Sequence, residues 1–244
     1  MHSHMNILIT GGSRGLGLAV ARQQLELGNS VYVVNRSISS ELNELIEQHK
    51  WRAVFVECDL AKPDTIKDSV FERHIGNKVP IHGFVNNAAV AYDELVSNMD
   101  CELVESMFQV NVFSPMVLTK LVIRNMLLHQ SKGTMVHISS ICCHTGYKGL
   151  AMYAATKGAM EAFSKNVARE WGSKGIRSNS VVPGFMDTSM SSTLAQSDRD
   201  KILNRTALKE AVSIGSVAST IGFLLSNASC SITGKEFVVD AGTI

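Results

Sequence analysis

Short apolar runs rich in β-branched residues alternate with longer amphipathic stretches along most of the chain. Each run is continuously apolar or nearly so, which is typical of strands buried on both faces of a parallel sheet. Seven strands are expected, at Asn6–Thr10, Val31–Val34, Ala53–Glu57, His82–Asn86, Thr134–Ser139, Arg177–Val182 and Glu236–Val239.

The stretches between these runs have helical periodicity. We expect helices at about Leu16–Leu27, Glu41–His49, a segment after Pro63, Met99–His129, Met152–Trp171 and Ser216–Ser226. Strands alternating with helices predict an α/β fold, a doubly wound parallel seven-stranded sheet of Rossmann type with right-handed crossovers. No linker or repeat interrupts the pattern, so residues 6–244 are interpreted as a single domain. Residues 1–5 are set aside as a short N-terminal tail, native or left from cloning.

Composition narrows the function classes. Apolar residues make up 45% of the 244 residues and charged residues 18%, with a net charge of +1. This balance predicts a soluble globular protein and gives no basic stripe for nucleic acid or an anionic membrane. We also expect no bilayer-spanning run and no secretory signal, and therefore a cytoplasmic location.

Five cysteines without a CxxC pair argue against a disulfide framework and against zinc. The eight histidines lack metal-ligand spacing, so no metal is expected and the histidines are interpreted as surface or loop residues.

A glycine-rich turn joins the first strand to the first helix, at Thr10–Gly17. Glycines in such a turn permit close approach to a phosphate, and the helix N-terminus favours the negative charge of a pyrophosphate. The predicted contacts are Gly11, Ser13, Arg14, Gly15, Leu16 and Gly17. A purely structural turn is the alternative.

The end of the second strand distinguishes the two nicotinamide cofactors. An NAD site usually has an acidic residue there for the ribose 2′-hydroxyl. This chain has Asn35, Arg36 and Ser37 instead, and Arg14 can reach the same place. Two guanidinium groups suit a 2′-phosphate, which predicts NADPH/NADP+. The alternative is that both arginines are solvated surface charges.

Further cofactor contacts are expected at other strand ends, where ligands bind in open α/β sheets. They are Asp59 and Leu60 for the adenine, Asn87 and Ala88 for the ribose, and Pro183, Gly184, Met186 and Thr188 for the carboxamide. Asp59 has a helix cap as its alternative role, and the small residues of Asn86–Ala89 have a tight turn.

Tyr153 and Lys157 are four residues apart, which places them on one helix face. A nearby ammonium favours the phenolate, so we expect Lys157 to lower the pKa of Tyr153 toward neutrality. Ser140, at the end of the fifth strand, is expected to donate to a substrate oxygen. Asn111 is expected to hold a water that links Lys157 to solvent, with a structural backbone hydrogen bond as the alternative.

Together these segments resemble the short-chain dehydrogenase/reductase family. The resemblance rests on Thr10–Gly17, Asp59-Leu60, Asn86–Ala89, Asn111, Ser140, Tyr153–Lys157 and Pro183–Thr188. It implies that Asn111, Ser140, Tyr153 and Lys157 form the catalytic set; Ser140 is preferred to Ser139 because it stands thirteen residues before Tyr153. The resemblance also implies a homotetramer or homodimer that packs through the helices around Asn111 and after Tyr153.

Within the family the chain is most similar to bacterial 3-oxoacyl-acyl-carrier-protein reductases. Ala89, Leu208–Ala211 and the loop Ile141–His144 depart from that branch. The resemblance implies basic residues at the mouth of the site that meet an acidic carrier protein. Lys174 and Lys132 stand in the matching places, although a neighbouring position holds Ser131.

The resulting hypothesis is NADPH-dependent reduction of a ketone, with a carrier-bound 3-oxoacyl thioester as the first candidate and Tyr153 as general acid. One alternative is an NAD(P)-dependent dehydrogenase of another secondary alcohol, sugar or polyol. A second is a nucleotide-binding subunit without catalysis. The sequence does not identify the carbonyl, because the expected pocket lid at Ser189–Ala211 is not diagnostic.

Overall fold

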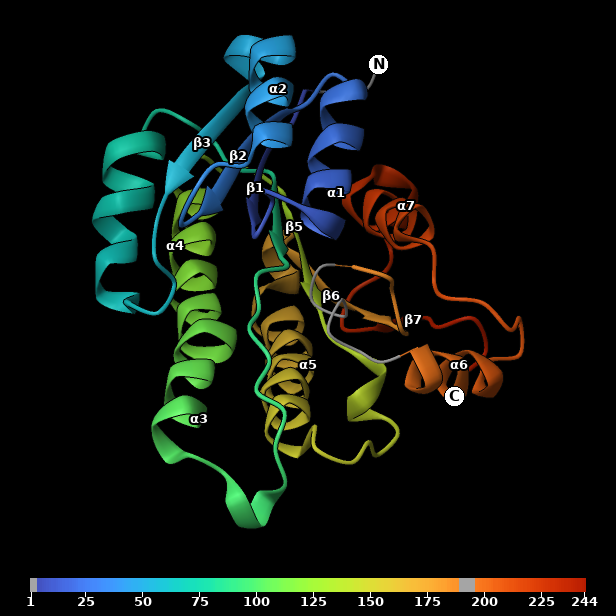
Figure 1. The fold of residues 1–244 in the computed structure, drawn as a ribbon. Coiled ribbons are helices and arrows are strands. Elements are labelled where there is room, and N and C mark those ends of the chain that lie inside the picture. The colour runs from blue at the N-terminus through green and yellow to red at the C-terminus, as the bar shows by residue number, and fades with distance from the viewer. Residues whose placement is uncertain (1–3, 189–195) are drawn as a thin grey trace.

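The computed structural model describes residues 4–188 and 196–244. Its centre is a seven-stranded sheet in the order β3-β2-β1-β4-β5-β6-β7, with every neighbouring pair parallel (Figure 1). The strands are β1 (Asn6–Thr10), β2 (Ser30–Asn35), β3 (Ala53–Glu57), β4 (Gly83–Asn86), β5 (Thr134–Ile138), β6 (Arg177–Pro183) and β7 (Glu236–Val239). The predicted doubly wound α/β sheet is confirmed, and strand ends differ from the predicted ones by one residue at most.

Helices cover both faces of the sheet. They are α1 (Gly15–Glu26), α2 (Ser40–His49), α3 (Cys101–Phe108), α4 (Ser114–Leu128), α5 (Ala151–Trp171), α6 (Gln196–Arg205) and α7 (Ile214–Leu225). Two segments have π-helical hydrogen bonding, Lys67–Ile75 and Gln109–Phe113. Short 3-10 turns lie at Lys50–Arg52, Pro63–Thr65, Val96–Asn98, Ile141–Cys143, Gly172–Lys174 and Asn227–Ser229.

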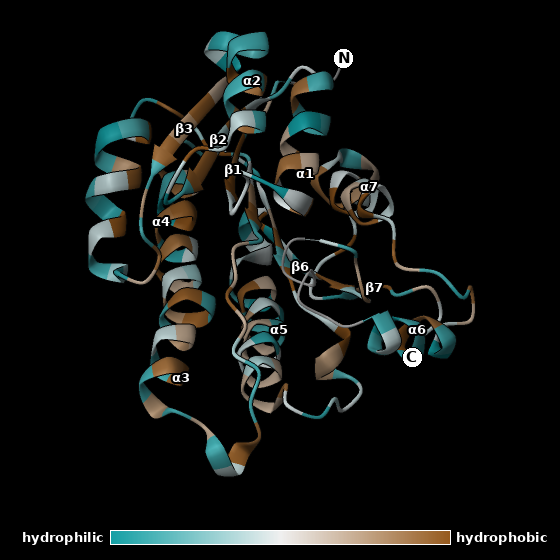
Figure 2. Ribbon diagram, in the orientation of Figure 1, coloured by the Kyte–Doolittle hydropathy of each residue, from teal (hydrophilic) through white to brown (hydrophobic). Residues whose placement is uncertain are grey.

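The two faces of the sheet form two separate cores. Successive residues of a strand point to opposite faces, and β1 follows this rule: Ile7 and Ile9 pack with α1, α2 and α7, while Leu8 packs with α4, α5 and the helix at Lys67–Ile75. Figure 2 shows the apolar colour along β2 and β3 and polar colour on the outer turns of the helices. The sheet is therefore buried on both sides, as its continuously apolar strands predict.

Three expectations need correction. Helix α6 falls in a stretch where no helix was predicted, because Gln196–Arg205 is strongly polar and lacks a buried face. His137 is fully buried in β5, between the rings of Phe84 and Phe163, and is not a surface residue. His4 and Met5 belong to the packed chain, since the His4 ring bonds to the Gly28 carbonyl oxygen and to Ser30.

The helical segment Cys101–Leu128 is long and apolar enough to cross a bilayer by length and composition alone, a test that the core helix of a globular protein also passes. Half of its most apolar 18-residue stretch is buried inside the domain. Leu118, Val122 and Met126 of α4 are buried in the core beside β4 and β5. This burial is typical of the core helix of a globular protein.

Candidate active site

At two of its positions the glycine turn packs too closely against backbone atoms to accept a side chain. A Cβ added at Gly17 would lie 2.4 Å from the carbonyl oxygen of Gly11, and one added at Gly11 would lie 2.9 Å from the Cα of Ala88. Gly11 also has a φ of +68°, in the left-handed region that favours glycine. The turn, helix α1 and the loop after β4 are therefore in direct backbone contact.

Helix α1 begins directly after this turn. Arg14 occupies the N-cap in an extended conformation, and no side chain of the described residues caps this end. The first turn of α1 also contains no acidic residue, in this fully described segment. Unpaired N–H groups and the positive end of the helix dipole make such a terminus suitable for an anion.

Asn87 holds the loop after β4 against the glycine turn. Its Nδ2 donates to the carbonyl oxygens of Thr10 and Gly11, both at 3.0 Å. The backbone N–H groups of Asn87 and Ala88 both donate to Thr10 Oγ1, also at 3.0 Å. The Asn87 amide nitrogen therefore holds the loop in position. This is a structural role, in line with the tight turn that was the alternative interpretation of Asn86–Ala89.

The end of β2 is tied to the same turn. Ser13 Oγ donates to the carbonyl oxygen of Ser37 at 2.8 Å, and Asn35 Nδ2 donates to that oxygen at 3.0 Å. Arg14, Arg36 and Ser37 are exposed. Arg14 and Arg36 therefore both follow the carboxyl ends of neighbouring parallel strands, β1 and β2.

The other predicted cofactor contacts lie at the carboxyl ends of β3 and β6. Asp59 is partly buried and accepts a hydrogen bond from the N–H of Ala61 at 3.0 Å, while Leu60 is buried. At β6, Pro183 is buried, and a Cβ on Gly184 would lie 2.7 Å from the Cα of Asp240.

Met186 and Thr188 follow β6 and are partly buried. The expected lid at Ser189–Ala211 lies partly outside the described residues, which resume at Gln196 with α6.

Tyr153 and Lys157 lie one turn apart near the start of α5. The Lys157 Nζ is 5.6 Å from the centre of the Tyr153 ring and donates to the carbonyl oxygen of Ile138 at 2.7 Å. Lys157 is only 5% exposed. Burial lowers the pKa of Lys157 to about 8.

The expected lowering of the Tyr153 pKa is wrong for the protein in this state. Burial raises the pKa of Tyr153, and negative charge at Cys142 and Cys143 would raise it further. Desolvation of the buried ring disfavours the charged phenolate. The phenol is therefore protonated at neutral pH.

Ser140 begins the turn that follows β5. Its backbone is extended, and its Oγ accepts a hydrogen bond from the N–H of Cys142 at 3.3 Å. The carbonyl of Ile138, two residues earlier, is the acceptor for Lys157. The strand end that carries Ser140 is thus in direct contact with the Tyr153/Lys157 helix.

Asn111 lies in the π-helical segment between α3 and α4, a kind of distortion often found at functional sites. Its Oδ1 accepts from the N–H of Val90 at 2.9 Å, and its Nδ2 donates to the carbonyl oxygen of Val90 at 2.8 Å. The same nitrogen donates to Thr156 Oγ1 at 3.1 Å. The Asn111 amide thus makes hydrogen bonds to the backbone. This is the structural role that was the alternative to holding a water molecule.

A polar network adjoins Ser139, the neighbour of Ser140. Glu161 of α5 accepts hydrogen bonds from Ser139 Oγ and from His144 Nε2, the latter at 3.0 Å. Glu236 of β7 is close by, and ligand atoms of His144, Glu161 and Glu236 lie within 4.8 Å of one another. Lys165 pairs with Glu236 at 2.7 Å, so an ammonium already balances that carboxylate. The expectation that the protein uses no metal stays a prediction.

Sequence reasoning missed three side chains around the site. Thr156 bridges Asn111 and the carbonyl of Tyr153, Glu161 anchors Ser139 and His144, and His137 is buried near Lys157. Burial together with the charge of Lys157 lowers the pKa of His137 to about 4. Only Glu161 carries a local signal, because a carboxylate on the buried face of a predicted helix requires partners.

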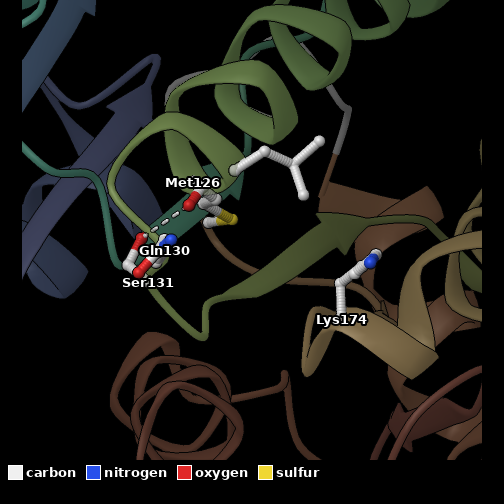
Figure 3. A pocket seen from close by; sticks show the side chains of 5 residues that line it. Met126, Gln130, Ser131 and Lys174 are labelled. Carbon is white, nitrogen blue, oxygen red and sulfur yellow. Dashed lines mark hydrogen bonds between the residues drawn. The ribbon is translucent and has the colours of Figure 1, made fainter.

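A separate shallow pocket is lined by Met126, Leu127, Gln130, Ser131 and Lys174 (Figure 3). The stem of Lys132 packs over Gly175 beside it. Lys132 precedes β5 and Lys174 precedes β6, so both lie at the amino ends of the strands. Ser140 follows the carboxyl end of β5. The expectation that these lysines flank the mouth of the site is therefore wrong within one chain.

Comparison with known proteins defines the class. A family model described as enoyl-(acyl carrier protein) reductase matches residues 11–243. The 3-oxoacyl-[acyl-carrier-protein] reductase of Buchnera aphidicola is 31% identical over 96% of this chain and 95% of that protein. The L-xylulose reductase of Caenorhabditis elegans is 30% identical over 97% of this chain and 94% of that protein.

Among solved structures, a gluconate 5-dehydrogenase from Burkholderia cenocepacia, in complex with NADP and tartrate, superposes with a TM-score of 0.90. It is 25% identical, and the match covers 98% of this chain and 94% of the other. The chain belongs to the short-chain dehydrogenase/reductase family. It is an oxidoreductase that acts on secondary alcohols or ketones.

Proposed function

We propose that the protein catalyses NADPH-dependent reduction of a ketone to a secondary alcohol. The observation that carries this proposal is the contact between α5 and the end of β5. There the buried Lys157 donates a hydrogen bond to the carbonyl of Ile138, two residues before Ser140. The Lys157 Nζ also lies 5.6 Å from the centre of the Tyr153 ring. We assign the role of acid to Tyr153, of oxygen-directed donor to Ser140 and of cation to Lys157, at the carboxyl edge of the sheet, where ligands bind in this architecture.

The residues around the glycine turn fit a dinucleotide. Added Cβ atoms would fill the space at Gly11 and Gly17, and the start of α1 is open to an anion. We assign the pyrophosphate to the segment Gly11–Gly17 and the adenosine 2′-phosphate to Arg14, Arg36 and Ser37. When bound, the nicotinamide supplies the two electrons of the reduction.

The chain's own residues then handle the proton. The Tyr153 hydroxyl donates its proton to the alkoxide oxygen as that oxygen forms, and Ser140 Oγ donates a hydrogen bond to the same oxygen. Burial raises the pKa of Tyr153, which keeps the phenol in the protonated form that reduction requires. Lys157 stabilises the phenolate left behind and passes it a replacement proton. Asn111 positions Thr156 and the Val90 loop around this helix.

For the substrate, a 3-oxoacyl thioester on an acyl carrier protein is our first candidate. It is supported by the 31% identity to a reductase of that name. Lys132 and Lys174 would attract an acidic carrier, but they lie at the opposite edge of the sheet from Ser140. A carrier bound there would have to serve the site of another copy of the chain.

The second candidate is a sugar or polyol. The similarity to L-xylulose reductase and to gluconate 5-dehydrogenase supports it. Its carbonyl would use the same Tyr153 and Ser140. The two candidates differ in what surrounds the carbonyl, an apolar acyl chain in the first case and hydroxyl groups in the second.

We further propose a cytoplasmic homotetramer, or a homodimer, that packs through α4 and α5. A groove between these helices is lined by Met116, Thr119, Lys120, Ile123, Arg124, Leu127, Phe163, Val167, Glu170 and Trp171. Phe113 and Leu103, nearby along the same helical segment, are about half exposed. Apolar surface of this kind is typical of association sites.

One experiment tests the reaction and the cofactor together. NADPH oxidation is followed with acetoacetyl-acyl carrier protein, acetoacetyl-coenzyme A, simple ketones and L-xylulose, and each assay is repeated with NADH. We expect turnover with NADPH and a drop in kcat of at least about 100-fold in Tyr153→Phe, the size of a general-acid contribution. Arg36→Asp should shift the preference toward NADH.

Unchanged turnover in Tyr153→Phe would refute the assigned acid. Tight binding of NADPH without turnover of any carbonyl would favour a nucleotide-binding subunit without catalysis. A preference for NADH in the wild-type protein would favour an oxidising dehydrogenase of an alcohol or polyol.

A further inference from the structure

Glu161 lies one helical turn beyond Lys157 on α5. Tyr153, Lys157 and Glu161 are spaced four residues apart, so they lie along one side of the helix. Glu161 is only 8% exposed. Carboxylates are almost never buried to this extent without partners, because hydrogen bonds or opposite charges must replace the lost water. The proposed reduction assigns no role to this buried side chain.

One oxygen of the Glu161 carboxylate holds both ends of the loop that carries Ser140. Glu161 Oε1 accepts from Ser139 Oγ at 2.5 Å and from His144 Nε2 at 3.0 Å. Ser139 stands directly before Ser140, and His144 caps the 3-10 turn that follows it. A neutral ring protonated at Nε2 and a cationic ring can both donate in this way. The loop 139–144 is therefore fastened to α5 at its two ends.

Cys143 provides a third attachment between the loop and α5. Its Sγ donates to the carbonyl oxygen of Ala154, the neighbour of Tyr153, at 3.4 Å. Within the loop, a backbone hydrogen bond of the 3-10 turn joins His144 to the residue that follows Ser140. A shift of His144 is therefore transmitted to the backbone beside Ser140.

We propose that Glu161 is a positioning residue for the candidate oxygen donor, Ser140. Through its bonds to Ser139 and His144, it fixes the place of the Ser140 hydroxyl relative to α5. Because Tyr153 lies on that same helix, the two hydroxyls keep a constant separation. The inference rests on the proposed function, in which both hydroxyls must reach one oxygen atom. A misplacement of about 1 Å in such a pair can lower a rate by about 100-fold.

The charges around Glu161 indicate which property of its side chain the loop uses. Glu236 of β7 faces it, and ligand atoms of His144, Glu161 and Glu236 lie within 4.8 Å of one another. Lys165, one turn further along α5, pairs with Glu236 at 2.7 Å and balances that second carboxylate. Both bonds to the loop end on one acceptor oxygen, which an amide also provides. We therefore expect Glu161→Gln to keep the loop in place and Glu161→Met to release it.

The first test is a double-mutant cycle of Glu161→Met and Ser140→Ala, in which NADPH oxidation is followed with the carbonyl that is turned over fastest. We expect Glu161→Met to lower kcat by at least about tenfold and to leave the affinity for NADPH unchanged. In the Ser140→Ala background the same change should have almost no further effect, because the group that it misplaces is gone. Glu161→Gln should retain most of kcat. The exposed Glu44→Met is the matched control and should behave as wild type.

Amide hydrogen exchange gives a second measurement, which needs no substrate. The N–H groups of His144 and Thr145 both donate to the Ile141 carbonyl at 2.9 Å. They should exchange faster in Glu161→Met than in wild type, and at the wild-type rate in Glu161→Gln. If Glu161→Met does not fold, Ser139→Ala and His144→Ala each remove one of the two bonds and take its place in both measurements.

Unchanged exchange in Glu161→Met would overturn the inference, as would a loss of kcat that is equally large with and without Ser140. Failure of the proposed function has a different signature. A Ser140→Ala variant with full kcat would refute the role assigned to Ser140 itself, and faster exchange in Glu161→Met would then mark a structural contact only.

Discussion

The Nζ of Lys157 and the carbonyl oxygen of Ile138 are joined by a 2.7 Å hydrogen bond between α5 and the end of β5. This bond anchors a buried ammonium to the strand that leads into Ser140. It also fixes the start of α5, and hence Tyr153, relative to the sheet. Because burying that charge destabilises the fold, the effect of Lys157 on the free energy of unfolding should depend on pH.

Lys157→Met should raise stability more at neutral pH than at high pH. Burial lowers the pKa of Lys157 to about 8, against 10.5 for the free side chain. Between these values the unfolded chain binds more protons, so this lysine makes the free energy of unfolding rise with pH. Below pH 8 the folded state bears the full penalty, about 3 kcal/mol.

The measurement is urea unfolding at pH 7 and pH 10, with the exposed Lys78→Met as control. The methionine variant also leaves the Ile138 carbonyl without its hydrogen-bond donor. This loss lowers the free energy of unfolding by the same amount at both pH values. The pH dependence is therefore the decisive quantity. A stability difference from wild type that does not change between the two pH values would contradict the prediction.

His137 should make the protein sensitive to acid. Its pKa is lowered to about 4 in the fold, against 6.5 for the free side chain. Between pH 6.5 and pH 4 the unfolded chain gains a proton that the folded chain excludes, so stability falls as pH falls through this window. In His137→Gln, the free energy of unfolding should depend less on pH between 6.5 and 4 than in wild type.

The exposed His74→Gln is the matched control for this titration. Its profile of unfolding free energy against pH should follow that of the wild type in the same window. If His137→Gln and the wild type had equal slopes, the acid sensitivity would come from other groups.

Gly17→Ala should weaken NADPH binding with little change in secondary structure. The new methyl group would lie 2.4 Å from the Gly11 carbonyl oxygen, so the turn or α1 must move. A loss of at least about tenfold in affinity is expected, equivalent to about 1.4 kcal/mol. Fluorescence titration with NADPH measures it.

Gly215→Ala, in α7, is the control for this change. There the added methyl meets only Ser213 Oγ, at 3.4 Å, an ordinary contact distance. Alanine is also the better helix former, so this variant should be as stable as wild type or slightly more so. Comparable losses of NADPH affinity in the two variants would contradict the close-packing explanation.

Asn111→Ala should destabilise the fold by about 1–3 kcal/mol. It removes the acceptor of the Val90 N–H, the donor to the Val90 carbonyl oxygen and a donor to Thr156, and leaves polar backbone atoms unpaired in a partly buried place. Chemical unfolding measures the change. The exposed Asn43→Ala removes only a surface bond to Glu47, so an effect of similar size there would count against this account.

The sheet could be predicted because its strands are buried on both faces, which leaves a continuous apolar run in each. Helix α6 could not, because Gln196–Arg205 has no apolar face to reveal its period. Tyr153, Lys157 and the glycine turn carry local spacing that motifs can detect. The protonation of Tyr153 depends on burial by distant segments, so its raised pKa has no sequence signal.

The partners of Asn111 also could not be predicted from the sequence. Val90 lies 21 residues earlier in a loop without regular structure, and no spacing rule links the two. The lysines near the pocket at Ser131 were misplaced for a different reason. A motif gives the order of residues along the chain, whereas strand direction decides which edge of the sheet they occupy.

The π-helical segment Gln109–Phe113 sets the angular phase of the helix on either side of it. An α-helix turns by about 100° per residue, so one extra residue within a turn rotates everything beyond it by that amount. The segments before and after it, Cys101–Phe108 and Ser114–Leu128, therefore differ in which side they turn toward the rest of the domain. A uniform α-helix could not direct both sides correctly at the same time. Deleting one residue here would swing Asn111 away from Val90, or the core residues of α4 away from the sheet, whichever end stayed fixed.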